Sequence, residues 1–153
     1  MKLIAGITLL IALTASAVAQ DKIRATMLGE RVGVAIEKGD LAKLDDVLAD
    51  KAAIYWIDKK FKDKASFEKY MRVQVSSFDN RTMSLSEDGG MDDDKISTSW
   101  GTFAFLNSKG NSGVGSRMMG RYTVVATEVD GKWRIIAMHF SIAFPPDLPD
   151  PIN

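Results

Sequence analysis

Three side chains of this sequence could carry out acid–base chemistry. His139 is the only histidine of the 153 residues and lies in a nearly unbroken apolar run, where an imidazole could shuttle a proton or bind a ligand oxygen. Tyr122 provides a phenol from the preceding apolar run. Asp58 is the carboxylate nearest to the aromatic run at residues 52–57, and it could act as a base. Each also has a structural explanation. His139 could bond a backbone carbonyl or Tyr122, and Asp58 could be a solvated turn residue before two lysines.

Aromatic residues provide candidates for a ligand-binding surface. Tyr55 and Trp56 lie in the run AAIYWI, residues 52–57, and Trp100 lies in the alternating segment SWGTFAF, residues 99–105. Such side chains could line a cavity, or they could belong to the core or to a subunit interface. The ligand-binding set predicted from the sequence comprises Tyr55, Trp56, Trp100, Tyr122 and His139.

The sequence lacks the usual motifs for metals and cofactors. One histidine without cysteines cannot form a usual zinc site, and Asp92-Asp93-Asp94 lacks the residue order of an EF-hand calcium loop. The glycine-rich segment GNSGVGS, residues 110–116, lacks the Lys-Ser or Lys-Thr ending of a phosphate-binding loop. The sequence therefore predicts neither a metal nor a cofactor.

The first 19 residues have the features of a secretory signal peptide, with one basic residue, an apolar run and a small-residue ending. We expect cleavage before Gln20 and export to the periplasm or the medium, without a stable membrane anchor; an uncleaved signal anchor is the alternative. The mature chain would have 19 basic and 20 acidic residues, a net charge of 19 − 20 = −1, so nucleic acid is not an expected partner. Residues 20–145 then suit one domain, followed by an extended proline-rich tail over residues 146–153.

Hydrophobic periodicity predicts three helices in the first half of the domain. Apolar residues recur at helical spacing over residues 23–38. Asp40 could cap a second helix over residues 41–50, and a third helix is expected over residues 63–77 with Asp63 as its cap.

Strand-like sequence dominates the second half. The β-branched and aromatic run AAIYWI predicts one short buried strand between the second and third helices. Four further strands are expected at about residues 81–87, 95–106, 116–129 and 133–144. Helices followed by an antiparallel sheet define an α+β domain.

The final hairpin allows a register to be calculated. Asp130-Gly131 between two apolar runs favours a type I′ turn, so paired residues would have numbers that sum to 261, and Tyr122 would face His139. Both faces of this hairpin would be apolar, so we expect helices to cover one face and a second copy of the chain to cover the other. The candidate dimer contacts in this register are Met138, Phe140 and Ile142. A bulge in the hairpin would exchange the two faces.

Three segments resemble the NTF2-like superfamily and, within it, the bacterial SnoaL-like and DUF4440-type proteins. They are EKGD before LAKL, then KDKASFEKYM at residues 62–71, and GRYTVVATEVDGKWRIIAMHFS at residues 120–141. The last looks like the family's closing hairpin, in which D-G-x-W precedes alternating apolar positions and an H-x-S ending; the association domain of calmodulin-dependent kinase II is similar there. The resemblance implies a cystatin-like, cone-shaped α+β barrel with three helices on a strongly curved sheet, a cavity between them, and frequent dimerisation.

The resemblance leaves the reaction open, because the superfamily includes isomerases, cyclases, dehydratases and non-catalytic members. Our first hypothesis is an exported homodimer that binds a small, largely apolar molecule in its cone. The second is a cofactor-free acid–base enzyme in which His139 and Tyr122 form the working pair, with Asp58 as auxiliary. The third is an interaction module that binds no ligand.

Overall fold

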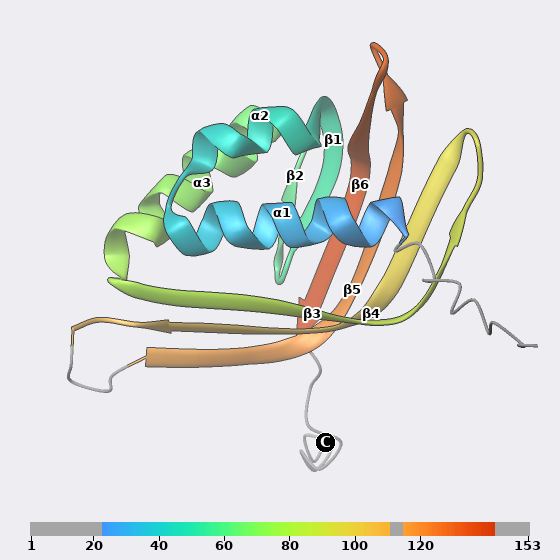
Figure 1. The fold of residues 1–153 in the computed structure, drawn as a ribbon. Coiled ribbons are helices and arrows are strands. Elements are labelled where there is room, and N and C mark those ends of the chain that lie inside the picture. Colours follow the sequence, from blue (N-terminus) through green and yellow to red (C-terminus); the bar gives the residue numbers. More distant parts are fainter. Residues whose placement is uncertain (1–22, 111–114, 143–153) are drawn as a thin grey trace, which may run out of the picture.

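Three helices lie against the concave face of one curved, six-stranded sheet, so the protein has the α+β architecture predicted from its sequence (Figure 1). The computed structural model describes residues 23–110 and 115–142. The predicted signal peptide and C-terminal tail lie outside the described residues. Within the described part of the chain, no helix is long and apolar enough to cross a membrane.

Two of the three predicted helices form as expected. α1 (Arg24–Lys38) buries one apolar stripe against the sheet and ends at Gly39, which has a φ of 71° and donates its N–H to the Ile36 carbonyl at 3.2 Å. α3 (Lys64–Ser77) begins after Asp63, whose carboxylate accepts the Ser66 N–H at 2.8 Å. The predicted N-cap of this helix is therefore confirmed.

The predicted second helix is wrong in its C-terminal part. The chain forms a 3-10 turn, η1 (Leu41–Lys43), and a single helical turn, α2 (Leu44–Val47), and Asp40 makes no capping hydrogen bond with its side chain. From Leu48 onward the chain is extended, because Leu48 already pairs with the last strand of the sheet. Strand pairing thus overrides the helical spacing of the leucines.

The sheet has the strand order β2-β1-β6-β5-β4-β3, and every neighbouring pair is antiparallel except β1 and β6, which run parallel. Its strands are β1 (Leu48–Trp56), β2 (Lys59–Phe61), β3 (Asn80–Asp92), β4 (Ile96–Ser108), β5 (Gly115–Val129) and β6 (Lys132–Ile142). β2 was not predicted, because its lysine-rich sequence lacks apolar alternation. β3 continues through Gly89-Gly90, where a loop was expected, with a bulge between Glu87 and Gly89.

Glycines allow the long strands β4 and β5 to bend, and the bend carries the sheet around beneath the helices (Figure 1). A Cβ atom on Gly101 would lie 2.0 Å from the carbonyl oxygen of Ser86, and one on Gly120 would lie 1.8 Å from that of Ser141. Both clashes are with the backbone of a neighbouring strand, so movement of a side chain cannot relieve them. The curvature of the sheet therefore depends on glycine at these two positions.

The final hairpin has the predicted turn, but its register changes partway along the strands. Asp130 and Gly131 both have positive φ, 52° and 73°, as a type I′ turn requires. Pairing follows the predicted register as far as Ala126 opposite Ile135, and a bulge at Ile136 then shifts it by one residue. Beyond this bulge the two faces of β6 are exchanged, whereas those of β5 stay as predicted.

The exchange corrects two predictions. Tyr122 pairs with Phe140, and His139 pairs with Thr123, so the predicted Tyr122–His139 pair is wrong. Met138 and Phe140, proposed above as dimer contacts, are 2% and 0% exposed and face the helices. Only the third proposed contact, Ile142, is exposed.

Aromatic side chains fill most of the space between the helices and the sheet. Trp56 lies between Phe67 of α3 and Phe140 of β6, with ring centroids 5.8 and 5.0 Å apart. Phe140 also contacts Phe103 of β4 at 5.2 Å, and all four rings are buried. Pairs at these separations add about 0.5–1.5 kcal/mol each beyond the burial of their surface. These four rings form one continuous aromatic cluster between α3 and the sheet.

Candidate functional site

A pocket of about 280 Å³ remains open at the mouth of the cone, between α3, the turn from β1 to β2, and the ends of β4 and β5. Apolar and aromatic walls with a few polar groups are typical of small-molecule sites. The residues that line this cone-mouth pocket are Trp56, Ile57, Asp58, Tyr70, Met71, Gln74, Phe78, Phe105, Asn107, Ser116 and Met118. Trp56 and Asp58, two of the residues singled out in the sequence, therefore lie at the same site.

A strained turn places Asp58 at the pocket. Ile57 and Asp58 form the two-residue connection between Trp56 and Lys59, which are paired across β1 and β2. Ile57 has a φ of 62°, a left-handed conformation that costs a β-branched residue roughly 1–2 kcal/mol. The Ile57 N–H donates to the Phe140 carbonyl at 2.7 Å, which ties the strained residue to β6. Strain of this kind concentrates at functional sites.

Tyr70 of α3 is the main polar residue of the pocket that the predicted site set missed. Its ring packs against Phe61, with centroids 5.2 Å apart, and the Lys59 ammonium lies 4.6 Å from its ring centroid. Burial raises the pKa of the Tyr70 hydroxyl, and the negative charge of Asp58 raises it further. Among the described residues this hydroxyl has no hydrogen-bond partner, so it is available as a donor. Its position on the apolar face of the predicted helix was the signal that could have found it.

The pocket combines an apolar wall with separate donors and an acceptor. Tyr70 and Gln74 can donate hydrogen bonds, and Asp58 can accept them. Asn107 is held in place by Ser116. The side-chain oxygen of Asn107 accepts hydrogen bonds from the Ser116 N–H at 3.1 Å and from the Ser116 hydroxyl at 2.6 Å. In the described part of the chain, no group of three acidic or histidine side chains could hold a metal ion. The arrangement fits a small ligand with an apolar body and one polar end.

Tyr122 lies deeper in the cone, away from this pocket. Its hydroxyl is 3.1 Å from the Ser99 hydroxyl, which in turn accepts a 2.8 Å bond from Thr26 of α1; Thr26 also contacts the Glu87 carboxylate. Burial is the main cause that raises the pKa of Tyr122, although the bond with Ser99 opposes it. Tyr122 is 2% exposed and forms part of a hydrogen-bonded chain that fixes α1 to the sheet. The structure thus places it in the core.

Replacing Ser99 with alanine is expected to destabilise the fold by roughly 1–3 kcal/mol, because the Tyr122 and Thr26 hydroxyls would lose their buried partner. Urea unfolding followed by circular dichroism measures the change. Ser84→Ala on exposed β3 provides the control, with an expected change within about 0.5 kcal/mol. Equal unfolding midpoints for the two variants would show that the chain of hydroxyls does not stabilise the fold.

The other predicted ligand contacts lie on the outer face, the face of the sheet that the helices leave open. One residue from each strand forms a continuous row across this face: Lys60, Tyr55, His139, Thr123, Trp100 and Gly89. The Tyr55 and His139 rings meet edge to face with centroids 5.8 Å apart, beside a shallow, largely apolar depression of about 330 Å³. Tyr55, Trp100 and His139 are all exposed, so these three side chains are not in the cone, where the predicted ligand would bind.

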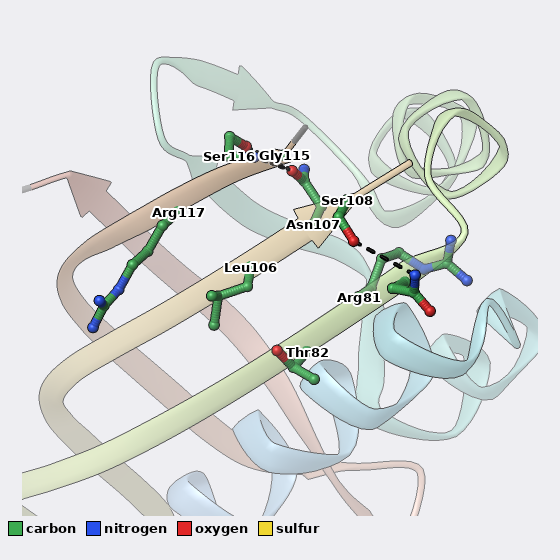
Figure 2. Close-up of a pocket in the computed structure, with 9 residues that line it drawn as sticks. Arg81, Thr82, Leu106, Asn107, Ser108, Gly115, Ser116 and Arg117 are labelled. Carbon is green, nitrogen blue, oxygen red and sulfur yellow. Dashed lines mark hydrogen bonds between the residues drawn. The ribbon is translucent and has the colours of Figure 1, made fainter. Parts of the chain in front are cut away.

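Another cleft, of about 340 Å³, lies over the far ends of β3, β4 and β5 (Figure 2). Its two arginines, Arg81 and Arg117, point in opposite directions in Figure 2. The Arg81 guanidinium donates to backbone carbonyls near the ends of α1 and α3, those of Ile36, Val75 and Phe78. Because the two cations do not converge, we regard this cleft as a weaker candidate than the cone-mouth pocket.

Solved structures of bacterial proteins share this fold. An NTF2-like superfamily protein from Salmonella enterica serovar Typhimurium is 14% identical, with a TM-score of 0.70 over 83% of this chain and 94% of its own. A candidate calcium/calmodulin-dependent protein kinase II association domain from Xanthomonas campestris is 22% identical, with a TM-score of 0.65 over 79% and 85%. A candidate NTF2-like dehydratase from Streptomyces avermitilis is 11% identical, with a TM-score of 0.68 over 78% and 94%. At these identities the likeness establishes the fold alone.

The sequence itself identifies the family. No curated protein matches the chain significantly in sequence. Residues 30–145 match the SnoaL-like domain, a span that includes α3, the cone-mouth pocket and the whole sheet. The protein therefore belongs to the SnoaL-like domain family and has the NTF2-like fold.

Proposed function

We propose that this protein binds a small, largely apolar molecule in the cone-mouth pocket. The observation that carries the proposal is the pocket itself, where aromatic walls meet the unpartnered Tyr70 hydroxyl, the Gln74 amide and the Asp58 carboxylate. Its volume of about 280 Å³ is close to the lower end of the range of ligand pockets, roughly 300–1,000 Å³. The ligand is therefore small, with an aromatic or branched body and one group that both donates and accepts hydrogen bonds.

The geometry does not support the alternative, an acid–base enzyme in which His139 and Tyr122 act as a pair. The two side chains lie on opposite faces of the sheet, so they cannot act on one substrate. In the cone-mouth pocket, the raised pKa of Tyr70 keeps its hydroxyl protonated in neutral solution, which suits hydrogen bonding to a ligand better than removal of a proton. Binding is therefore the function that the pocket supports best.

Filling the pocket is expected to abolish binding. The variant Gln74→Phe places a large ring among the lining residues, and Val73→Phe places the same ring on the adjacent, 60% exposed position of α3. With neutral aromatic alcohols and ketones as probes, ligand-observed NMR should show at least a tenfold loss of affinity for Gln74→Phe and no loss for Val73→Phe. If both variants bind the probes as the wild type does, the site is elsewhere.

We also propose that two copies of the chain associate through their outer faces. Of the nine large apolar side chains that are exposed among the described residues, five lie there, namely Tyr55, Met91, Trp100, Leu106 and Met119. At exposures of 42–55%, they present on the order of 450 Å² of surface, more than half of the ~800 Å² that each partner of a standard interface buries. A two-fold axis would bring the same patch of each copy together.

Export is a separate proposal that rests on the signal-like first 19 residues. The mature protein would begin at Gln20 and act in the periplasm or the medium. N-terminal sequencing of the protein recovered from the producing cells tests this directly. A first residue of Met1 would overturn it.

A further inference from the structure

The only histidine of the chain lies within the aromatic part of the outer face. His139 is exposed, its ring meets the edge of Tyr55, and its cross-strand neighbour on the other side is Thr123. The depression beside it is lined mainly by small or apolar groups, among them Ala53, Val125 and Ala137. In a single chain this imidazole is open to water, whereas a partner seated on the outer face would cover it.

We propose that His139 makes the association of two copies dependent on pH, with the dimer favoured in neutral solution and the monomer in mildly acidic solution. This inference rests on the proposed outer-face dimer. Histidine is the side chain whose charge ordinarily changes between pH 5 and 8, and an apolar interface excludes the water that would solvate the charged form.

The charges around His139 reinforce this effect. On the β1–β2 side, the Lys60 ammonium lies 5.3 Å from the ring centroid of Tyr55, the ring that contacts His139. On the β5 side, Arg121 lies two residues from Thr123, and its guanidinium is 3.2 Å from the Asp88 carboxylate. The row that runs from Lys60 to Gly89 contains one other cation, Lys60, and no carboxylate, so a protonated His139 would meet a like charge and no anion in it. The Arg121–Asp88 pair beside the row has no net charge.

The direction follows from proton linkage. If the dimer excludes the charged form, the separated chains bind more protons than the dimer, so acid favours dissociation. Each dimer contains two such imidazoles. If both imidazoles take up a proton only in the separated chains, the dissociation constant is expected to rise by up to about 100-fold between pH 7.5 and pH 5.5, about tenfold for each imidazole.

Sedimentation velocity over a concentration series at pH 7.5, 6.5 and 5.5 measures this change. The dissociation constant of the wild-type dimer should rise by up to about 100-fold from pH 7.5 to pH 5.5. The variant His139→Gln keeps a neutral polar side chain of similar size, so its dissociation constant should be nearly the same at all three pH values. Circular dichroism at each pH verifies that the chains stay folded. A wild-type dissociation constant that does not change with pH overturns the inference, and so does a His139→Gln variant that weakens as much as the wild type.

These outcomes separate the inference from the dimer proposal. A wild type that is monomeric at every pH and concentration refutes the outer-face dimer and the inference with it. If the protein dimerises with the same dissociation constant at every pH, the dimer proposal stands and only the role of His139 is refuted.

Discussion

Replacing Gly120 with alanine is expected to destabilise the protein by roughly 3 kcal/mol or more, the largest effect of any single methyl group that we predict. The added Cβ would lie 1.8 Å from the Ser141 carbonyl oxygen and 2.8 Å from the Phe103 ring. β5 would have to move away from β6, which would disturb the bend of the sheet and the aromatic core together. Urea unfolding of the variant measures the loss.

A glycine-to-alanine substitution in α1, at Gly33, should instead stabilise the protein. A Cβ on Gly33 would make only ordinary contacts with Met83, the nearest at 3.4 Å, and alanine favours the helix over glycine by up to about 1 kcal/mol. Gly33→Ala therefore controls for the general effect of adding a methyl group. If Gly120→Ala unfolds at the same urea concentration as the wild type, the close approach of β5 and β6 is not a feature of the native sheet.

The second large effect concerns the outer face. Val125→Glu is expected to weaken the dimer by roughly 100-fold or more, because it would bury a carboxylate beside the apolar depression without a partner. In the separated chain this position is half-exposed, so the variant should still fold and still bind probes at the cone mouth. Sedimentation velocity at pH 7.5 gives the two dissociation constants.

Val73→Glu provides the matched control for this variant. It introduces the same side chain at a 60% exposed valine of α3, on the helical side of the molecule, and should leave the dimer unchanged. A Val125→Glu protein that associates as tightly as the wild type would show that the outer face is not the interface. The chain would then need another explanation for its exposed aromatic row, such as the ligand-free interaction module considered from the sequence.

Local sequence patterns were sufficient for much of the fold. The apolar stripe of α1, the Asp63 cap of α3 and the Asp130-Gly131 turn all depend on neighbouring residues, and the structure has each of them. Leu48 shows where such patterns fail. It continues a helical stripe in the sequence, but its pairing with β6 draws residues from the far end of the chain, which periodicity within a short window does not detect.

The bulge at Ile136 had the greatest consequence for the candidate site. One extra residue in β6 moved His139 to the outer face and Phe140 into the core, because side chains alternate along a strand. Nothing in a run of apolar residues marks where such a bulge falls. Trp56 and Asp58 lie at the cone mouth, at the end of the first strand as expected, because their positions depend on β1 and its turn and not on the bulge in β6. Tyr70 lies on the apolar face of α3 that periodicity predicts, but only the packing of α3 against β1 and β2 brings it to the same pocket.

Native mass spectrometry of the wild-type protein, recovered from the compartment in which it accumulates, tests the proposed function most directly. We expect a dimer in neutral solution that carries a small molecule on each chain, and we expect that molecule to be absent from Gln74→Phe and retained by Val73→Phe. A bound molecule that is equally abundant in both variants would contradict binding at the cone mouth. A monomer that carries nothing and binds none of the aromatic probes would contradict the account as a whole.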